Sequence, residues 1–181
     1  MEHIQSAIRA YFDARQEELI QAVCRLVRID STLGPAAPGQ PFGPGPAAAL
    51  DELVALAREW GLTAQNLEGY VGAVDLNDRE TELHILGHLD VVDPGEGWTV
   101  TSAFELVDGL LYGRGTDDDK GPVLAALMAM RAVKDLGFSL KKNVRLIAGT
   151  DEETGFRDIH WYYERHPYAP HTLSPDADFP I

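Results

Sequence analysis

The chain has 181 residues, enough to bury one good core, and its single cysteine, Cys24, lies on a helical apolar pattern that predicts a buried thiol. Its formal net charge of −14 argues against nucleic acid as a partner, because such a surface repels phosphates. No apolar run reaches membrane-spanning length and the N-terminus shows no signal-peptide pattern, so we expect a cytoplasmic protein without a membrane partner.

The first third of the chain is predicted to be helical. Apolar residues at spacings of three and four predict a helix over residues 14–28, with Asp13 as its N-cap and a shorter helical piece before it. Five prolines and four glycines predict a loop over residues 34–46. A second helix is expected over residues 47–60, ending at Gly61, which suits the position after a helix C-terminus.

Strand and helix patterns alternate in the rest of the chain. An Asp-Gly pair at residues 108–109, between two apolar runs, predicts a hairpin. The tail after residue 164 is expected to be a loop. The alternation predicts an α/β fold with a mainly parallel sheet flanked by helices, in which ligands bind beyond the carboxyl ends of the strands. The predicted elements are strands over 70–76, 82–86 and 144–148, a hairpin over 104–112, and helices over 122–136 and 156–164.

Four polar clusters lie at the ends of these elements. In the first, His88 and Asp90 are two residues apart and point the same way in an extended chain, so Asp90 can hold the His88 ring. The others are the turn GRGTDDDKGP over residues 113–122, the acids of residues 151–153, and the acids of residues 176–178. Imidazole and carboxylates together form a ligand set that suits Zn²⁺ or Mn²⁺.

Each cluster also has a simpler interpretation. The acidic turn of residues 113–122 could cap the following helix, because an aspartate before a helix start accepts backbone N–H bonds. His88 could be a hydrogen-bonded surface histidine at a strand end, and the acids after residue 150 could form a solvated turn. A P-loop and a calcium loop are both excluded, because the required glycine-lysine spacing and the alternating acids are missing.

The order of the motifs HLDVV, GRGTDDDKGP, GTDEETG and SPDADFP resembles the co-catalytic di-metal aminopeptidase and aminoacylase superfamily of metallopeptidases. The loop PFGPGP, the Gly97-Trp98 pair and the tail PDADFPI resemble its peptidase V type of bacterial dipeptidases. The resemblance implies that residues 1–181 are the N-terminal portion of a zinc-peptidase-like catalytic domain. It further implies that a lid domain, the C-terminal catalytic portion and a last histidine ligand lie outside this chain, which should leave an apolar face exposed.

The resemblance also implies a set of metal ligands. His88 and Asp176 would bind one divalent ion, Glu153 would bind a second, and Asp118 would bridge the two. The ions would be zinc or manganese, with cobalt as a further option. A cis peptide bond is implied between Asp118 and Asp119, whereas neither Asp119 nor its neighbour Asp117 receives a role.

The implied reaction is the hydrolysis of dipeptides or short peptides. Glu152 would act as the general base for a metal-bridging hydroxide and Asp90 would orient His88. The longer protein would be a metallo-dipeptidase, and this chain alone would be inactive or nearly so. Two alternatives stay open: an N-acyl-amino-acid deacylase of the same superfamily, and a short non-catalytic chain that binds metal or a partner.

The residues predict no oligomeric state. The remaining histidines of the C-terminal region do not match the missing ligand motif and are expected at the surface: His160, His166 and His171.

Overall fold

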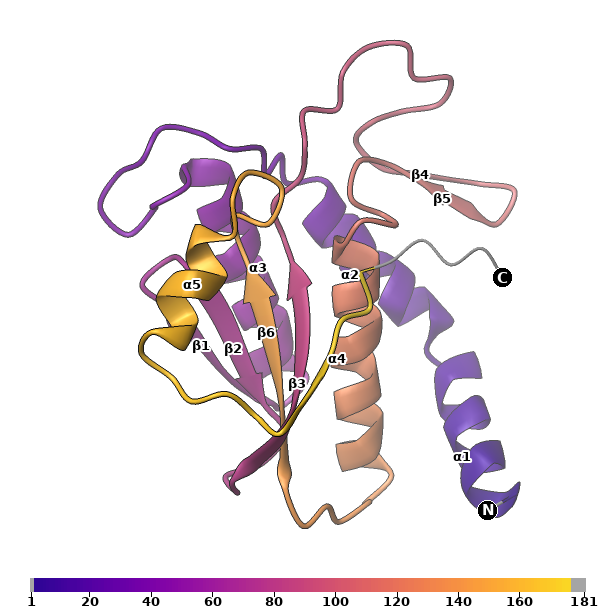
Figure 1. The fold of residues 1–181 in the computed structure, drawn as a ribbon. Helices are drawn as coiled ribbons and strands as arrows, with labels where there is room; N and C mark the ends of the chain where they lie inside the picture. Colours follow the sequence, from indigo (N-terminus) through magenta and orange to yellow (C-terminus); the bar gives the residue numbers. More distant parts are fainter. Residues whose placement is uncertain (1, 177–181) are drawn as a thin grey trace.

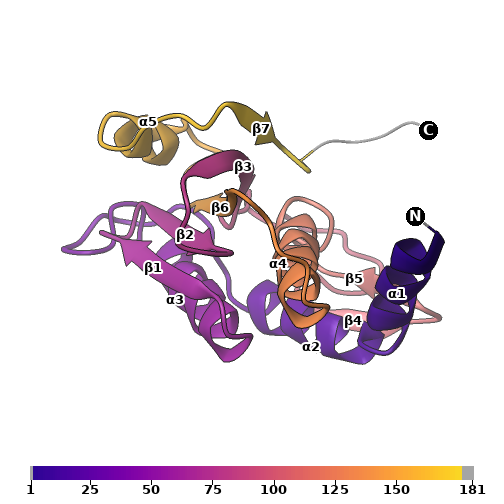
Figure 2. The same ribbon diagram turned by 90° about the horizontal axis from the view of Figure 1, so that it is seen from below.

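The computed structural model describes residues 2–176 and contains a five-stranded sheet with helices on both faces (Figure 1). Seen from below, helices pack against one face of the sheet and a short helix covers part of the other (Figure 2). The first face carries α3 (Pro44–Glu59) and α4 (Lys120–Asp135), on which α2 (Gln16–Val27) packs, and the second carries α5 (Arg157–Tyr163). The predicted α/β class is therefore confirmed.

The strand order of the sheet is β1-β2-β6-β3-β7. Strands β6, β3 and β7 run parallel, whereas β1 and β2 form a hairpin that adds to β6 in the antiparallel direction. The carboxyl ends of β3 and β6 lie side by side, since His88 is in register with Gly149. The strands are β1 (Thr63–Leu67), β2 (Val71–Asp75), β3 (Thr81–His88), β6 (Asn143–Gly149) and β7 (His171–Leu173).

The two faces of the sheet are packed differently. Aliphatic side chains of α2, α3 and α4 form the main core, and Leu26, Leu50 and Met128 in it are fully buried. Burying one such side chain stabilises the fold by roughly 1.5–3 kcal/mol. On the other face, Tyr162 of α5 is fully buried, and Trp161 stacks on Tyr70 with 4.6 Å between ring centroids. Cys24 is buried in α2, as predicted.

The helices begin and end close to the predicted residues, with two exceptions at their N-termini. A first helix, α1 (Glu2–Asp13), is 12 residues long, as is α2, so it is not the shorter piece that we expected. Asp13 ends α1 and Arg15 is the N-cap of α2, so the predicted capping role of Asp13 is wrong. Helix α3 begins at Pro44 rather than at residue 47, because proline is tolerated in the first turn of a helix.

Two strands were missed, and one hairpin was predicted correctly. Strand β1 has only Ala64 buried and all of β7 is exposed, so neither carries a strong apolar pattern. The predicted hairpin consists of β4 (Glu105–Val107) and β5 (Leu110–Tyr112), which lie outside the main sheet. Asp108 and Gly109 both have positive φ, as a two-residue turn of this kind requires.

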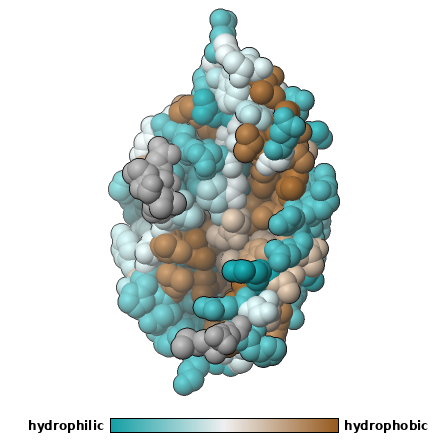
Figure 3. Space-filling view, turned by 90° about the vertical axis from the view of Figure 1, so that its right-hand side faces the viewer, coloured by the Kyte–Doolittle hydropathy of each residue, from teal (hydrophilic) through white to brown (hydrophobic). Residues whose placement is uncertain are grey.

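The side of the molecule that lies to the right in Figure 1 carries several apolar patches between hydrophilic side chains (Figure 3). Helix α1 and the β4-β5 hairpin lie on that side (Figure 1). Each carries large exposed apolar side chains, which are Ile4 and Ile8 in α1 and Leu106 and Leu110 in the hairpin. Within residues 2–176, no helix is long and apolar enough to cross a membrane.

Candidate metal centre

His88 lies at the carboxyl end of β3, and its side chain is almost fully buried. Its Nδ1 atom is 2.9 Å from the backbone carbonyl oxygen of Asp90. Because a carbonyl oxygen only accepts hydrogen bonds, Nδ1 carries a hydrogen in this contact. The other ring nitrogen, Nε2, therefore faces the acidic groups, with Oδ1 of Asp118 at 2.9 Å.

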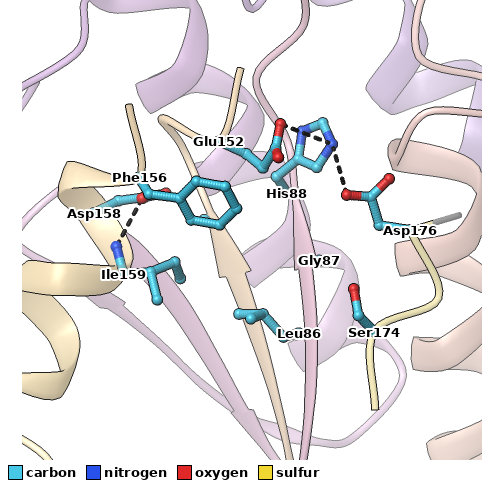
Figure 4. A pocket seen from close by; sticks show the side chains of 10 residues that line it. Leu86, Gly87, His88, Glu152, Phe156, Asp158, Ile159, Ser174 and Asp176 are labelled. Atoms are coloured by element: carbon cyan, nitrogen blue, oxygen red, sulfur yellow. Dashed lines mark hydrogen bonds and ion pairs between the residues drawn. The ribbon is translucent and has the colours of Figure 1, made fainter. Parts of the chain in front are cut away.

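Carboxylates from three further segments surround Nε2 of His88. Oδ2 of Asp176 lies 3.8 Å from it and Oε2 of Glu152 lies 3.9 Å from it, and Figure 4 shows both side chains turned toward the ring. Two groups of possible metal donors share this histidine: His88, Asp118 and Glu153, and His88, Glu152 and Asp176. Within each group the donor atoms lie within 4.8 Å of one another.

Asp90 connects the two strand ends that carry the cluster. Its carboxylate accepts hydrogen bonds from the backbone N–H groups of Glu152 at 3.1 Å and Glu153 at 3.0 Å. It also lies 3.5 Å from Nδ1 of His88, farther than the carbonyl oxygen of the same residue. Asp90 therefore contacts the histidine through its backbone as well as its side chain, and it fixes the turn that presents both glutamates.

A second buried aspartate supports the same turn. Asp158 at the start of α5 accepts backbone hydrogen bonds from Thr150 at 2.5 Å, Asp151 at 2.9 Å and Ile159 at 2.7 Å. The neighbouring Asp151 is fully buried and paired with Arg157 at 2.5 Å. The sequence analysis missed Asp158, whose only signal is an acidic residue in the first turn of a predicted helix.

The acidic turn of residues 113–122 sends its aspartates in different directions. Asp117 and Asp118 are exposed, whereas Asp119 is fully buried. The Asp118–Asp119 peptide bond is cis, as the family resemblance predicts. Lys120 is also fully buried, and its Nζ donates to the carbonyl oxygen of Ile29 at 2.8 Å. Burial lowers the pKa of Lys120 to about 8.

The pKa shifts of the cluster reflect an excess of negative charge. Burial alone lowers the pKa of His88, but the contacts with Asp90 and the charge of Asp119 outweigh it and raise the pKa to about 10. Burial raises the pKa of Asp119 to about 7, and burial together with neighbouring carboxylates raises the pKa values of Glu152 and Glu153. Crowded carboxylates of this kind are stabilised by a cation.

The donor set fits a divalent metal ion. It comprises one imidazole nitrogen and the carboxylates of Asp118, Glu152, Glu153 and Asp176. Within residues 2–176 none of these four is paired with a lysine or an arginine, and Asp118, Glu152 and Asp176 form ion pairs with His88. Nitrogen and oxygen donors in such numbers suit zinc or manganese.

A small cavity of about 40 Å³ adjoins the cluster (Figure 4). Its polar wall is formed by His88, Glu152, Ser174 and Asp176, and its apolar wall includes Leu86, Phe156 and Ile159. The carboxylates thus lie beside an apolar surface that a small side chain could contact.

The other histidines near the C-terminal region lie elsewhere. His160 and His171 are exposed, as expected. His166 is half-buried, because its ring stacks on Tyr162 with 4.5 Å between centroids. None of the three belongs to the two donor groups found among residues 2–176.

Comparison with known proteins identifies the family. Residues 84–179 match the model of peptidase family M20/M25/M40, so the chain belongs to this family, and the resemblance predicted from its motifs is confirmed.

Three relatives illustrate the similarity. YtjP of Bacillus subtilis (strain 168) is 40% identical over 170 residues, which are 92% of this chain and 37% of YtjP. Beta-Ala-Xaa dipeptidase of Lactobacillus delbrueckii subsp. lactis is 36% identical over 173 residues, 93% of this chain and 37% of that protein. The crystal structure of human carnosine dipeptidase 1 superposes with a TM-score of 0.79 at 26% identity, over 96% of this chain and 41% of that one. The chain thus spans little more than a third of the curated relatives it matches.

Proposed function

We propose that this chain supplies part of the metal centre of a longer protein, a dipeptidase that hydrolyses dipeptides or short peptides with two divalent ions. The observation that carries the proposal is the pair of donor groups that share His88 where β3 and β6 end. The dipeptidase names of two relatives support the substrate class.

The proposed ligands are those that the family resemblance implies, and all four belong to the two donor groups. His88, Asp118 and Asp176 would hold one ion, and Asp118 and Glu153 would hold the other, which is zinc or manganese, with cobalt as a further option. Bound divalent ions polarise a substrate carbonyl and lower the pKa of a water molecule from about 15.7 to about 7. A further ligand is expected from the part of the protein outside this chain.

Glu152 is the proposed general base and Asp90 the residue that orients the cluster. The Glu152 side chain is about one quarter exposed and faces the same ring nitrogen as the proposed ligand Asp176. Its backbone N–H donates to Asp90, which also contacts His88, so the backbone of Glu152 is held near the histidine. A carboxylate placed in this way can take a proton from the attacking water and give it to the leaving amine.

The test uses the complete protein with Glu152→Gln. We expect kcat for dipeptides to fall by about 10²- to 10⁴-fold while the metal content is unchanged, because the amide cannot accept the proton. Glu164→Gln is the matched control. It makes the same chemical change at an exposed residue that follows the last turn of α5. Full activity of a metal-free Glu152→Gln variant would contradict the proposal.

The same assay separates the substrate classes. The panel comprises an α-dipeptide, a β-alanyl dipeptide and an N-acetyl amino acid, each measured after chelation and after addition of zinc, manganese or cobalt. We expect both dipeptides to be hydrolysed faster than the acylated amino acid. Preference for the acylated substrate would assign the protein as a deacylase instead.

A further inference from the structure

Asp119 is a fully buried carboxylate for which the proposed metal centre has no use. It occupies the N-cap position of α4, yet its side chain makes no hydrogen bond to the helix. An aspartate at an N-cap usually accepts a hydrogen bond from the second or third N–H group of the helix. The simpler interpretation of this turn, that its acids cap the next helix, therefore fails for Asp119.

The carboxylate of Asp119 instead contacts the backbone of the central histidine. Its Oδ2 accepts a hydrogen bond from the N–H group of His88 at 3.1 Å. The next N–H group, of Leu89, donates to Gly149 of β6, and successive N–H groups of a strand point to opposite edges. The His88 N–H therefore faces the β7 side, where the pairing of β3 with β7 ends at Ile85. Asp119 provides the acceptor that the sheet does not supply.

Gly87 leaves the space that this carboxylate occupies. A Cβ atom at Gly87 would collide with Oδ2 of Asp119 and would lie 2.6 Å from Cγ2 of Val123. Contacts this short do not occur in folded proteins, so any side chain at this position would displace the carboxylate. The steric requirement at Gly87 and the hydrogen bond to His88 are separate observations that point to the same contact.

We infer that Asp119 is a positioning residue that holds the end of β3 against the acidic turn and thereby sets the position of His88 relative to Asp118. The inference rests on the proposed function, because it concerns a ligand of the proposed metal centre. Consecutive aspartates contact the histidine from two sides: Asp118 lies 2.9 Å from the ring nitrogen Nε2, and Asp119 binds the backbone N–H. Within the described residues Oδ1 of Asp119 has no hydrogen-bond partner, so Oδ2 alone makes the contact that positions His88.

The first test compares Asp119→Leu with Asp119→Asn in the complete protein. Leucine has a similar size but no acceptor, whereas asparagine keeps one carbonyl oxygen for the His88 N–H. We expect zinc affinity, measured by competition with a chelating dye, to fall about 10- to 100-fold in the leucine variant. The asparagine variant should stay within about threefold of the wild type, and this rescue distinguishes positioning through one acceptor from a need for the charge.

A second readout needs neither metal nor activity. In the metal-free protein, we expect the His88 amide to exchange with deuterium at least about tenfold faster in Asp119→Leu than in the wild type or in Asp119→Asn. Amides of β6 are the internal control, because their hydrogen bonds do not involve Asp119. Equal exchange of the His88 amide in all three proteins would overturn the inference.

Gly87→Ala provides a test that removes no polar atom. Alone, it should weaken zinc binding in the same way as Asp119→Leu, because the added methyl group displaces the carboxylate. In an Asp119→Ala background the same substitution should have a much smaller effect, because no carboxylate is left to displace; the effect that remains measures the collision with Val123, which both backgrounds share. Additive effects of the two substitutions would contradict the inference. This comparison decides the case if Asp119→Leu fails to fold.

The outcomes also separate this inference from the proposed function. If the wild type binds zinc and hydrolyses dipeptides but Asp119→Leu binds zinc equally well, the positioning role is refuted and the function stands. If the wild type binds none of zinc, manganese and cobalt, the proposed function fails. The exchange of the His88 amide then still supports or refutes the contact with Asp119.

Discussion

Two sets of carboxylates lie at the same end of the sheet and differ in what surrounds them. The supporting set, Asp90, Asp151 and Asp158, is buried and accepts hydrogen bonds from backbone N–H groups or from Arg157. The facing set, Asp118, Glu152, Glu153 and Asp176, is partly exposed, and within residues 2–176 its only ion pairs are those of Asp118, Glu152 and Asp176 with His88. The supporting set thus finds its hydrogen-bond donors within the chain itself, whereas the facing set is one that a cation would stabilise.

The difference shows how neighbouring acids acquire different roles. Asp151 and Glu152 are adjacent in sequence, but the first is fully buried beside Arg157 and the second faces the histidine. Asp118 and Asp119 are divided in the same way. Replacing a supporting residue should therefore lower stability, and replacing a facing residue should lower activity. The predictions below test this division.

The largest effect is expected for Asp118→Ala in the facing set. Removal of the proposed bridging ligand should lower kcat/KM of the complete protein by about 10³-fold, equivalent to about 4 kcal/mol. The free energy of unfolding of the metal-free protein should stay the same or rise, because an exposed carboxylate is removed from a crowded site. Dipeptide hydrolysis and urea unfolding measure the two quantities. A loss of stability as large as the loss of activity would break the division.

A smaller effect, on stability, is expected for Asp158→Ala in the supporting set. The substitution leaves three backbone N–H groups without an acceptor, those of Thr150, Asp151 and Ile159. We expect the free energy of unfolding to fall by about 3 kcal/mol, because each buried unpaired donor costs about 1–3 kcal/mol. Asp158→Asn is the matched variant and should lose about half as much, since it keeps one oxygen. Urea unfolding of the metal-free protein provides the measurement, and a loss below about 1 kcal/mol would argue against the supporting role.

The smallest effect is expected for Arg157→Met and depends on pH. Burial raises the pKa of Asp151, but the hydrogen bonds from Arg157 and Thr154 outweigh it and hold the pKa below its usual range. The stabilisation is therefore present above the unfolded-state pKa of about 3.9 and is lost as the pH falls through the lower folded-state pKa. We expect the variant to lose about 1 kcal/mol at pH 7, a value kept low because Arg157 is more than half exposed.

The measurement for Arg157→Met is urea unfolding at several pH values. The difference from the wild type should shrink below about pH 4, where Asp151 becomes protonated in the variant and then in the wild type. A difference that stays constant from pH 7 to pH 3 would show that Arg157 contributes by packing rather than by pairing with the carboxylate.

The sequence predicted most of the fold because most elements carry a clear apolar pattern. Helix α4 and strand β6 contribute fully buried Leu124 and Ile147 and were placed within two residues of their ends. Strands β1 and β7 could not be found in this way, because their residues are mainly exposed. Their pairing depends on neighbours that are distant in sequence, and local propensity does not record such contacts.

The candidate site was predicted unevenly. The family motifs gave six residues, and the structure brings their side chains together at the ends of β3 and β6, although their separate roles stay predictions. The contacts of Asp119 with His88 and of Asp158 with Thr150 could not be predicted. Each contact joins an acid at the start of a helix to a backbone N–H group of another segment, and only the folded chain shows which N–H groups need such an acceptor.

The place of β6 in the sheet has a consequence for the nascent chain. Strand β6 lies between β2 and β3 but follows both in sequence, so each has an unpaired apolar edge until residues 143–149 are made. At about 5–20 residues per second, this wait lasts several seconds during synthesis. Insertion of β6 closes both edges and removes the risk of pairing with another chain. The same event brings Glu152 to His88, so a chain that has assembled this part of the centre has also sealed its sheet against aggregation at these two edges.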